Sequence, residues 1–141
     1  MRSAVEVGVD IVKISTLGTM LSTGGPTFRE MCWTPEELAH CRGSVSRLAA
    51  RWAAKEAAMK ALGKGIGQID PIEIEVTGLE GQRPTLRLHG SALALARQQD
   101  VDLAVSMSHE GDYAIAFAVA TPRLTKICGH DLLEGGNNGA Q

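Results

Sequence analysis

Three side chains of this 141-residue sequence, Asp10, Glu56 and Lys60, have the types and spacing that metal-assisted chemistry on phosphates needs. Glu56 and Lys60 are four residues apart in an alanine-rich run, so they share one face of a predicted helix. Asp10 lies in a valine-rich segment, and it can meet Glu56 if strand and helix pack together. Proteins usually hold Mg²⁺ with one or two carboxylates and leave positions open for water and substrate phosphate. Asp10 and Glu56 therefore predict a magnesium site.

Other readings of these residues remain open. Glu56 and Lys60 could be an ordinary solvated helix pair, which is a common arrangement, and Asp10 could be an exposed strand position. Zinc fits poorly, because no Cys or His residues occur at metal-ligand spacing. Nucleophilic catalysis has no support either, since the sequence has neither a GxSxG motif nor a Cys/His arrangement.

Basic and glycine-rich segments accompany the predicted helix. Arg47, Arg51 and Lys55 form a basic stripe on a different side of the helix from the acidic residue. The glycine-rich turn that follows can bring backbone N–H groups close to a phosphate, although it is neither a P-loop nor a dinucleotide fingerprint. This turn consists of Gly63, Lys64, Gly65, Ile66 and Gly67.

Histidines are the remaining candidates. His109 lies in a predicted turn just after a strand, where it is either a site residue or a structural hydrogen-bonding group. The others are expected to be structural or on the surface: His40, His89 and His130.

Two elements must position the carboxylates. Valines alternate with Glu6, Gly8 and Asp10, a pattern that predicts a half-buried strand in which Asp10 points away from the valines. Residues 46–62 are rich in helix formers, contain no Gly or Pro and end at Gly63, so they predict a long helix.

The rest of the chain supplies shorter elements. Thr34-Pro35-Glu36-Glu37 predicts a capping box that starts a short helix reaching about Cys41. Residues 15–27 predict a mobile loop or an irregular helix. The remaining predictions are a hairpin of strands 72–76 and 85–88, a helix over 91–99, and strands 103–107 and 113–119 joined by a turn at 108–112.

Together these elements predict one α+β domain in which a long helix covers one face of an antiparallel sheet. We expect the domain to span residues 1–122 and residues 123–141 to form a flexible tail. Such a half-covered sheet in a chain with five aromatic residues leaves apolar surface, so self-association is expected.

Composition limits the partners. The chain is 44% hydrophobic and 21% charged, as in ordinary globular domains, and its net charge of -2 argues against nucleic-acid binding. Its three cysteines show no CxxC spacing, which favours a reducing compartment. No signal peptide or membrane-length apolar run is present, so we expect a cytoplasmic protein without a membrane partner.

Three segments in order resemble the holo-[acyl-carrier-protein] synthases, the small phosphopantetheinyl transferases. The resemblance covers about residues 5–120, and the ordered set is more specific than any one motif. The segments are Gly8-Val9-Asp10-Ile11-Val12, Arg51-Trp52-Ala53-Ala54-Lys55-Glu56-Ala57-Ala58-Met59-Lys60-Ala61-Leu62-Gly63, and Val105-Ser106-Met107-Ser108-His109.

The resemblance implies transfer of the 4′-phosphopantetheine arm of coenzyme A to a serine of an apo acyl carrier protein, with release of adenosine 3′,5′-bisphosphate. Such a reaction depends mainly on positioning and charge stabilisation. By this resemblance Asp10 and Glu56 hold Mg²⁺ and Lys60 lies beside a phosphate. Arg51 and His109 contact the nucleotide end of coenzyme A, including its 3′-phosphate. The base that takes the serine proton is either Glu56 or a water on the metal.

The resemblance also implies a homotrimer with sites at the subunit interfaces, so that Asp10 and His109 come from one chain and Glu56 from its neighbour, or the reverse. The carrier is either a free acyl carrier protein or a carrier domain of a fatty acid synthase. At Thr16 and Met31 the family commonly has arginines associated with carrier docking.

Two functions of other classes compete with transfer. One is a non-catalytic module that binds coenzyme A or a nucleotide, against which the carboxylate pair speaks. The other is a Mg²⁺-dependent phosphohydrolase, in which the same ligands would serve and water would replace serine.

Overall fold

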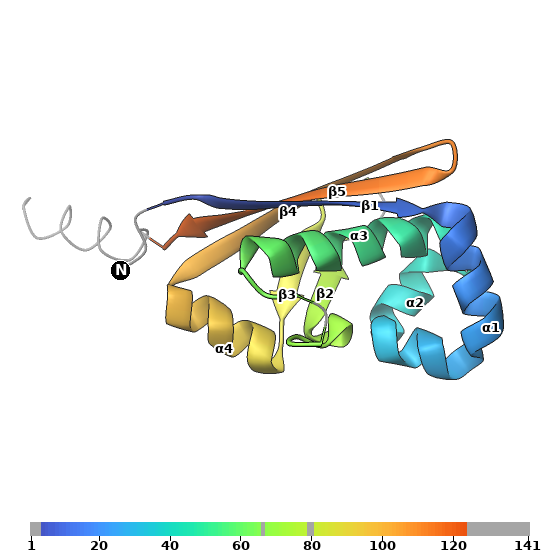
Figure 1. Ribbon diagram of the computed structural model, residues 1–141, viewed down its shortest axis with the longest axis horizontal. Helices are drawn as coiled ribbons and strands as arrows, with labels where there is room; N and C mark the ends of the chain where they lie inside the picture. The colour runs from blue at the N-terminus through green and yellow to red at the C-terminus, as the bar shows by residue number, and fades with distance from the viewer. Residues whose placement is uncertain (1–3, 66, 79–80, 124–141) are drawn as a thin grey trace, which may run out of the picture.

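The computed structural model describes residues 4–65, 67–78 and 81–123. A three-stranded antiparallel sheet forms one layer, and a long helix, α3, runs directly beneath it (Figure 1). The strands are β1 (Glu6–Lys13), β4 (Val101–Glu110) and β5 (Tyr113–Pro122), in the order β1-β5-β4. The predicted α+β architecture, with the long helix on one sheet face, is confirmed.

Small residues bring α3 (Val45–Ala61) close to the sheet. Alternate alanines of β5, from Ala114 to Ala120, are buried, and so are most alanines of α3. Gly8 of β1 crosses α3 so closely that a Cβ atom there would lie 2.0 Å from the carbonyl oxygen of Ala57. The backbone of β1 therefore rests on α3, and Asp10, two residues beyond Gly8, shares the face that points toward this helix.

Local capping signals fix two helices. Thr34 is the N-cap of α2 (Pro35–Cys41), and the reciprocal bonds of its capping box with Glu37 are both present. The Ser44 side chain caps α3, and Gly63 follows that helix with a φ of 78°. The sequence predictions for both helices are confirmed.

Residues 15–27 belong to α1 (Ile14–Cys32), so of the two expectations for them the irregular helix is correct. The helix is kinked at Gly25, whose φ of 62° and ψ of −154° are not helical, immediately before Pro26. Leu17 and Leu21 of its first half are buried in the core. This packing stabilises a helix in a segment whose apolar residues show no sustained helical period.

A second, two-stranded layer lies on the other side of α3. It is the hairpin of β2 (Ile74–Thr77) and β3 (Thr85–Leu88), followed by α4 (Gly90–Gln99). The strand predicted at 72–76 begins two residues too early, because a short 3₁₀ turn, η1 (Pro71–Glu73), precedes it.

The turn predicted at 108–112 is present but begins three residues too early. β4 continues to Glu110, and the chain turns at Gly111, which has a φ of 57°, and Asp112. His109 therefore lies in the strand, opposite Ala114 of β5. The tail expected over residues 123–141 lies outside the described residues apart from Arg123.

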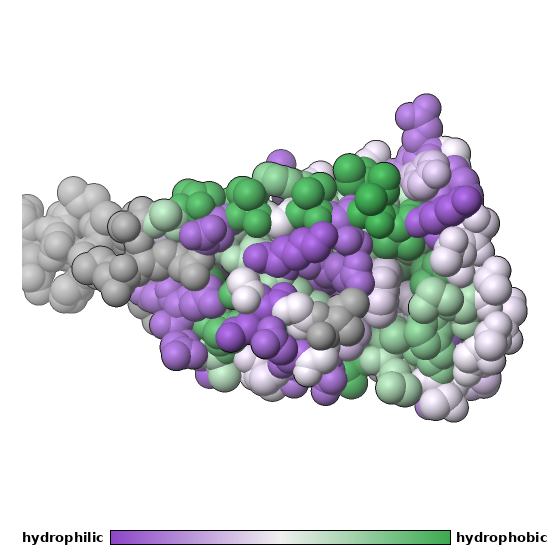
Figure 2. Space-filling view, viewed as in Figure 1, coloured by the Kyte–Doolittle hydropathy of each residue, from purple (hydrophilic) through white to green (hydrophobic). Residues whose placement is uncertain are grey.

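The sheet face that points away from α3 is apolar and exposed along β1 and β5. The valines predicted to lie opposite Asp10 occupy this face, and Figure 2 shows hydrophobic side chains along the edge where the sheet lies. Its members are between 42% and 63% exposed: Val5, Val7, Val9, Ile11, Tyr113, Ile115 and Phe117. We call this surface the valine face. Among the described residues no helix is long and apolar enough to cross a membrane.

Candidate functional site

Asp10 of β1 and Glu56 of α3 lie side by side within one chain. Their proximity follows from the close packing of Gly8 on Ala57, because Asp10 is two residues beyond the crossing and Glu56 directly precedes Ala57. The Lys60 ammonium lies 3.2 Å from Oδ1 of Asp10 and donates a 2.9 Å hydrogen bond to the carbonyl oxygen of Val9. The sequence prediction that these three residues meet is therefore supported by the geometry.

The two carboxylates form an electrostatically unfavourable pair. Partial burial, followed by the neighbouring Asp10 carboxyl, raises the pKa of Glu56 to about 8. Oδ2 of Asp10 is buried and has no hydrogen-bond partner among the described residues. A cation between the two groups would remove the repulsion and satisfy this oxygen.

The donor set fits Mg²⁺. No group of three or more His, Cys, Asp or Glu residues suited to hold a metal occurs within the described part of the chain, so this site offers two carboxylates only. Mg²⁺ is usually held by one or two carboxylates together with water and substrate phosphate. Asp10 and Glu56 would hold the ion.

The raised pKa predicts a pH-dependent stability of the metal-free protein. Folding disfavours the ionised form of Glu56, because its pKa rises from 4.5 in the unfolded chain to about 8 in the folded protein. The stabilisation that this group gives is complete below pH 4.5 and is lost as the pH rises through about 8. The melting temperature of the wild type should therefore fall relative to that of Glu56→Gln over this range. Thermal unfolding in EDTA measures this, and added Mg²⁺ should reduce the difference. If the melting temperatures of the two proteins changed in parallel with pH, the pKa of Glu56 would not be raised by folding.

A shallow pocket of about 260 Å³ lies beside the carboxylates, and it brings Lys64 and Gly65 next to Glu56 and Lys60. The backbone N–H groups of Gly63, Lys64 and Gly65 are already bonded to Lys60, Met59 and Gln68. The expected contact of these N–H groups with phosphate is thus not supported. What the turn adds to the site is the side chain of Lys64.

A larger pocket of about 540 Å³ lies between α2, α3 and the β2–β3 hairpin. We call it the arginine pocket, because Arg42, Arg47 and Arg51 line it together with His40. Nε of Arg51 is buried and has no hydrogen-bond partner within the described ranges. A concave site with several guanidinium groups and an unsatisfied donor is suited to a phosphate-bearing ligand.

Sequence reasoning found only part of this pocket. Arg51 was a candidate, and its spacing from Arg47 placed both on one face of the helix. His40 and Arg42 were missed, because the contribution of α2 depends on the tertiary packing. Lys55 lies on the predicted basic stripe but does not line the pocket, because its side chain is fully buried.

The two pockets lie on different sides of α3. Arg51 and Glu56 are five residues apart, a rotation of about 140° around the helix, and the pockets share no lining residue. His109 is exposed and lines neither pocket. One chain thus unites Asp10, Glu56 and Lys60 but not Arg51 and His109, and the expectation that the two carboxylates come from different subunits is wrong.

This small α+β fold thus combines a carboxylate pair suited to a divalent cation with an arginine pocket suited to a phosphate-bearing ligand. A family model described as the 4′-phosphopantetheinyl transferase superfamily matches residues 6–118. The chain belongs to this superfamily and, by its relatives, to the holo-[acyl-carrier-protein] synthases within it.

The relatives are similar over most of their length. A holo-[acyl-carrier-protein] synthase of Herpetosiphon aurantiacus is 46% identical over 120 residues, covering 79% of this chain and 94% of the relative. The ACPS-CoA complex of Chronobacterium ammoniagenes is 36% identical with a TM-score of 0.77, covering 86% of this chain and 100% of that one. The Helicobacter pylori holo-[acyl-carrier-protein] synthase in complex with coenzyme A is 28% identical with a TM-score of 0.74, covering 82% of this chain and 99% of that one.

Proposed function

We propose that this protein transfers 4′-phosphopantetheine from coenzyme A to a serine hydroxyl of an apo acyl carrier protein in a Mg²⁺-dependent reaction. The observation that carries the proposal is the Asp10–Glu56 pair beside Lys60, in a chain of this family. Two similar proteins have been solved with coenzyme A. The serine oxygen forms a bond to the phosphorus that carries pantetheine, the bond from that phosphorus to the bridging oxygen breaks, and adenosine 3′,5′-bisphosphate leaves.

Each site residue has a task in this reaction. When bound by Asp10 and Glu56, Mg²⁺ would stabilise negative charge on the pyrophosphate. An ammonium has three N–H donors, and Val9 and Asp10 take two of those of Lys60, which leaves one to reach a phosphate oxygen. Asp10 is paired with Lys60, so Glu56 is our candidate to accept the serine proton.

Product analysis separates this function from the two competing ones. Purified protein is incubated with coenzyme A and Mg²⁺, with and without an apo carrier, and adenosine 3′,5′-bisphosphate is quantified by liquid chromatography. A transferase releases it only when the carrier is present. Equal release without the carrier would identify a phosphohydrolase, and no release under either condition would identify a binding module.

The arginine pocket is our candidate for the nucleotide end of coenzyme A, with Arg51 contacting the 3′-phosphate. Arg51→Ala should weaken binding of coenzyme A much more than binding of 3′-dephospho-coenzyme A, by about 10-fold or more for loss of one charge-assisted hydrogen bond. Steady-state KM values for both substrates measure this. Wild type and variant discriminating equally between them would show that Arg51 does not contact the 3′-phosphate.

We further propose a homotrimer in which the valine face is buried and one chain's arginine pocket completes its neighbour's carboxylate site. Monomers rarely expose a contiguous apolar patch of this kind, and the two halves of the site lie on different sides of α3. His109, which lines neither of the two pockets within one chain, would contact the nucleotide end of coenzyme A in the assembly.

Subunit mixing tests this arrangement. The assay uses a coenzyme A concentration far below the KM of Arg51→Ala, where this variant has little activity. Mixed with an inactive Glu56→Gln protein, it should gain activity above that of the two proteins alone, because some interfaces then pair an intact Arg51 with an intact Glu56. Asp10→Ala mixed with Glu56→Gln should regain none, since both carboxylates belong to one chain. Recovery in the second mixture, or none in the first despite subunit exchange demonstrated by mass spectrometry, would contradict the model.

Carrier docking is expected at α1. Thr16 and Met31, where the family commonly has arginine, are both exposed on this helix, so neither departure disturbs the core. The carrier, whether a free protein or a domain of a fatty acid synthase, would meet these side chains there.

A further inference from the structure

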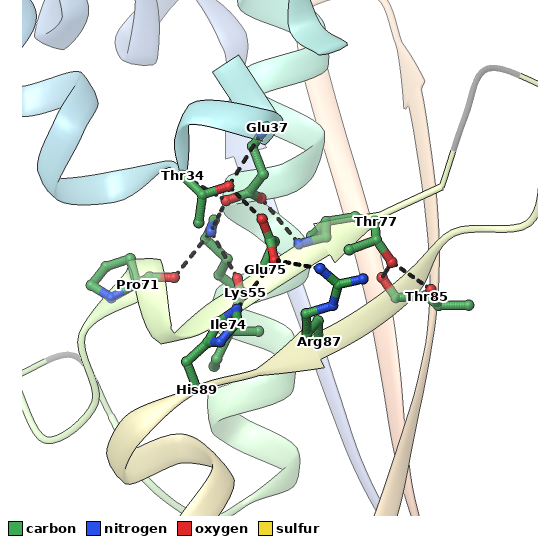
Figure 3. Close-up of polar contacts among 11 residues, drawn as sticks. Thr34, Glu37, Lys55, Pro71, Ile74, Glu75, Thr77, Thr85, Arg87 and His89 are labelled. Atoms are coloured by element: carbon green, nitrogen blue, oxygen red, sulfur yellow. Dashed lines mark hydrogen bonds and ion pairs between the residues drawn. The ribbon is translucent and has the colours of Figure 1, made fainter. Parts of the chain in front are cut away.

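A buried ion pair lies next to the arginine pocket but does not line it. Nζ of Lys55 is 2.6 Å from Oε1 of Glu37, and neither side chain is exposed to solvent. Lys55 also donates hydrogen bonds to the carbonyl oxygens of Pro71, at 3.0 Å, and Ile74, at 2.8 Å. All three donors of the ammonium are therefore used, and they join α3 to α2, η1 and the start of β2 (Figure 3).

Glu37 continues the same network toward the hairpin. Its Oε1 accepts the backbone N–H of Thr34 at 3.0 Å, and its Oε2 accepts the backbone N–H of Val76 at 3.1 Å. The carboxylate thus satisfies an N–H on the edge of β2 that faces away from β3. Thr34 also donates from its hydroxyl to the almost buried Glu75 of β2 at 2.7 Å (Figure 3), which gives α2 a second tie to this strand.

Burying such a pair is costly for stability alone. Burial lowers the pKa of Lys55, and the Glu37 carboxylate opposes this shift. Apolar residues of similar volume often stabilise a core as well as a buried ion pair does. Stability alone therefore does not explain the pair, and we consider instead that it fixes how the surrounding helices and strands are arranged.

Its position in the chain indicates which geometry. Glu37 lies two residues before Ala39, which lines the arginine pocket from α2. Lys55 lies one helical turn after Arg51, and Val76 directly precedes Thr77, which lines the pocket from the hairpin. Each wall of the pocket is thus tied to the pair within one turn or a few residues.

We propose that Glu37 and Lys55 are positioning residues that hold α2, α3 and the β2–β3 hairpin in the arrangement the arginine pocket needs to bind the 3′,5′-bisphosphate end of coenzyme A. The inference rests on the proposed function of that pocket. The pair touches no substrate, and it acts through the placement of the arginines and of the hairpin opposite them.

The test is binding of adenosine 3′,5′-bisphosphate to the full-length protein, measured by isothermal titration calorimetry with 5′-AMP as the comparison ligand. Glu37→Gln replaces one oxygen by an NH₂ group, so either the bond from Val76 or the bonds from Lys55 and Thr34 are lost. It should lower the affinity for the bisphosphate by about 10- to 100-fold, as removal of supporting residues commonly does. Lys55→Met should have at least the same effect. If that variant does not fold, Glu37→Gln decides the question alone.

A matched control separates positioning from general destabilisation. Val101→Ala removes a buried side chain of the same core at the far end of β4, and it should keep wild-type affinity although its melting temperature falls. Unchanged affinity in Glu37→Gln, or an equal loss in Val101→Ala, would overturn the proposal. Arg51→Ala tests the pocket itself: if it binds the bisphosphate as tightly as the wild type does, the proposed nucleotide site is wrong, whatever Glu37→Gln does.

Discussion

Asp10→Ala and Glu56→Ala should each reduce phosphopantetheine transfer by about 1,000-fold or more, because a metal ion supplies several kcal/mol of charge stabilisation and each variant removes one of its two proposed protein ligands. The fold should survive, since neither side chain belongs to the hydrophobic core. Initial rates at saturating Mg²⁺ and coenzyme A measure the loss.

The control for these variants is Asp102→Ala, which removes an exposed carboxylate paired with Arg123 far from the site. It should retain wild-type activity. Circular dichroism spectra must be similar in all of the variants, and none of them may melt well below the wild type. A near wild-type rate in either Asp10→Ala or Glu56→Ala would show that the carboxylate pair is not the metal site.

Among the glycines that the structure describes, Gly8→Ala should cause the largest loss of stability. The new Cβ would lie 2.0 Å from the carbonyl oxygen of Ala57 and 2.9 Å from the backbone nitrogen of Ala61, so β1 and α3 would have to separate. Overpacking of this kind typically costs up to about 3 kcal/mol. Thermal or urea unfolding measures the change, and activity should also fall, because Asp10 moves with β1.

The matched control is Gly18→Ala in α1. A Cβ there meets only Cγ1 of Val45, at 3.7 Å, an ordinary contact, and alanine favours a helix interior by up to about 1 kcal/mol over glycine. This variant should be as stable as the wild type or more so. If Gly8→Ala unfolded at the same urea concentration as the wild type, the close approach of β1 to α3 would be contradicted.

Elements whose signals lie within a few residues could be predicted from the sequence. The capping box of Thr34 and Glu37 is a local hydrogen-bond pattern, and α3 consists of strong helix formers that end before a glycine. For residues 15–27 the sequence left a mobile loop and an irregular helix open. The segment is helical because Leu17 and Leu21 pack into the core, and no pattern of neighbouring residues predicts this packing.

The fate of Lys55 and of His109 could not be predicted for a related reason. Lys55 lies on one stripe with Arg47 and Arg51, yet it alone turns inward, because Glu37 of another helix and two backbone carbonyls receive it. His109 was expected in a turn, and pairing with β5 keeps it in the strand. The burial of Lys55 depends on Glu37, 18 residues away in another helix, whereas the place of His109 depends on how far the β4–β5 hairpin stays paired before it turns.

The pairing of Asp10 with Glu56 was predicted, and the reason it holds is Gly8. In the sequence, a glycine within a valine-rich strand indicates only a position of low strand propensity. In the structure its missing side chain lets β1 rest on α3, and this close packing brings the two carboxylates together. The assignment of these carboxylates to different subunits failed because family resemblance does not state which contacts lie within one chain.

The most direct test of the central claim, that this protein is a phosphopantetheinyl transferase, is the intact mass of an apo acyl carrier protein after incubation with the protein, coenzyme A and Mg²⁺. We predict that the carrier gains the mass of one phosphopantetheinyl group, that the group maps to a single serine, and that neither Glu56→Ala nor a reaction in which EDTA replaces Mg²⁺ produces the gain. A carrier of unchanged mass, incubated with folded wild-type protein that binds coenzyme A and alongside a carrier known to be competent, would contradict the account.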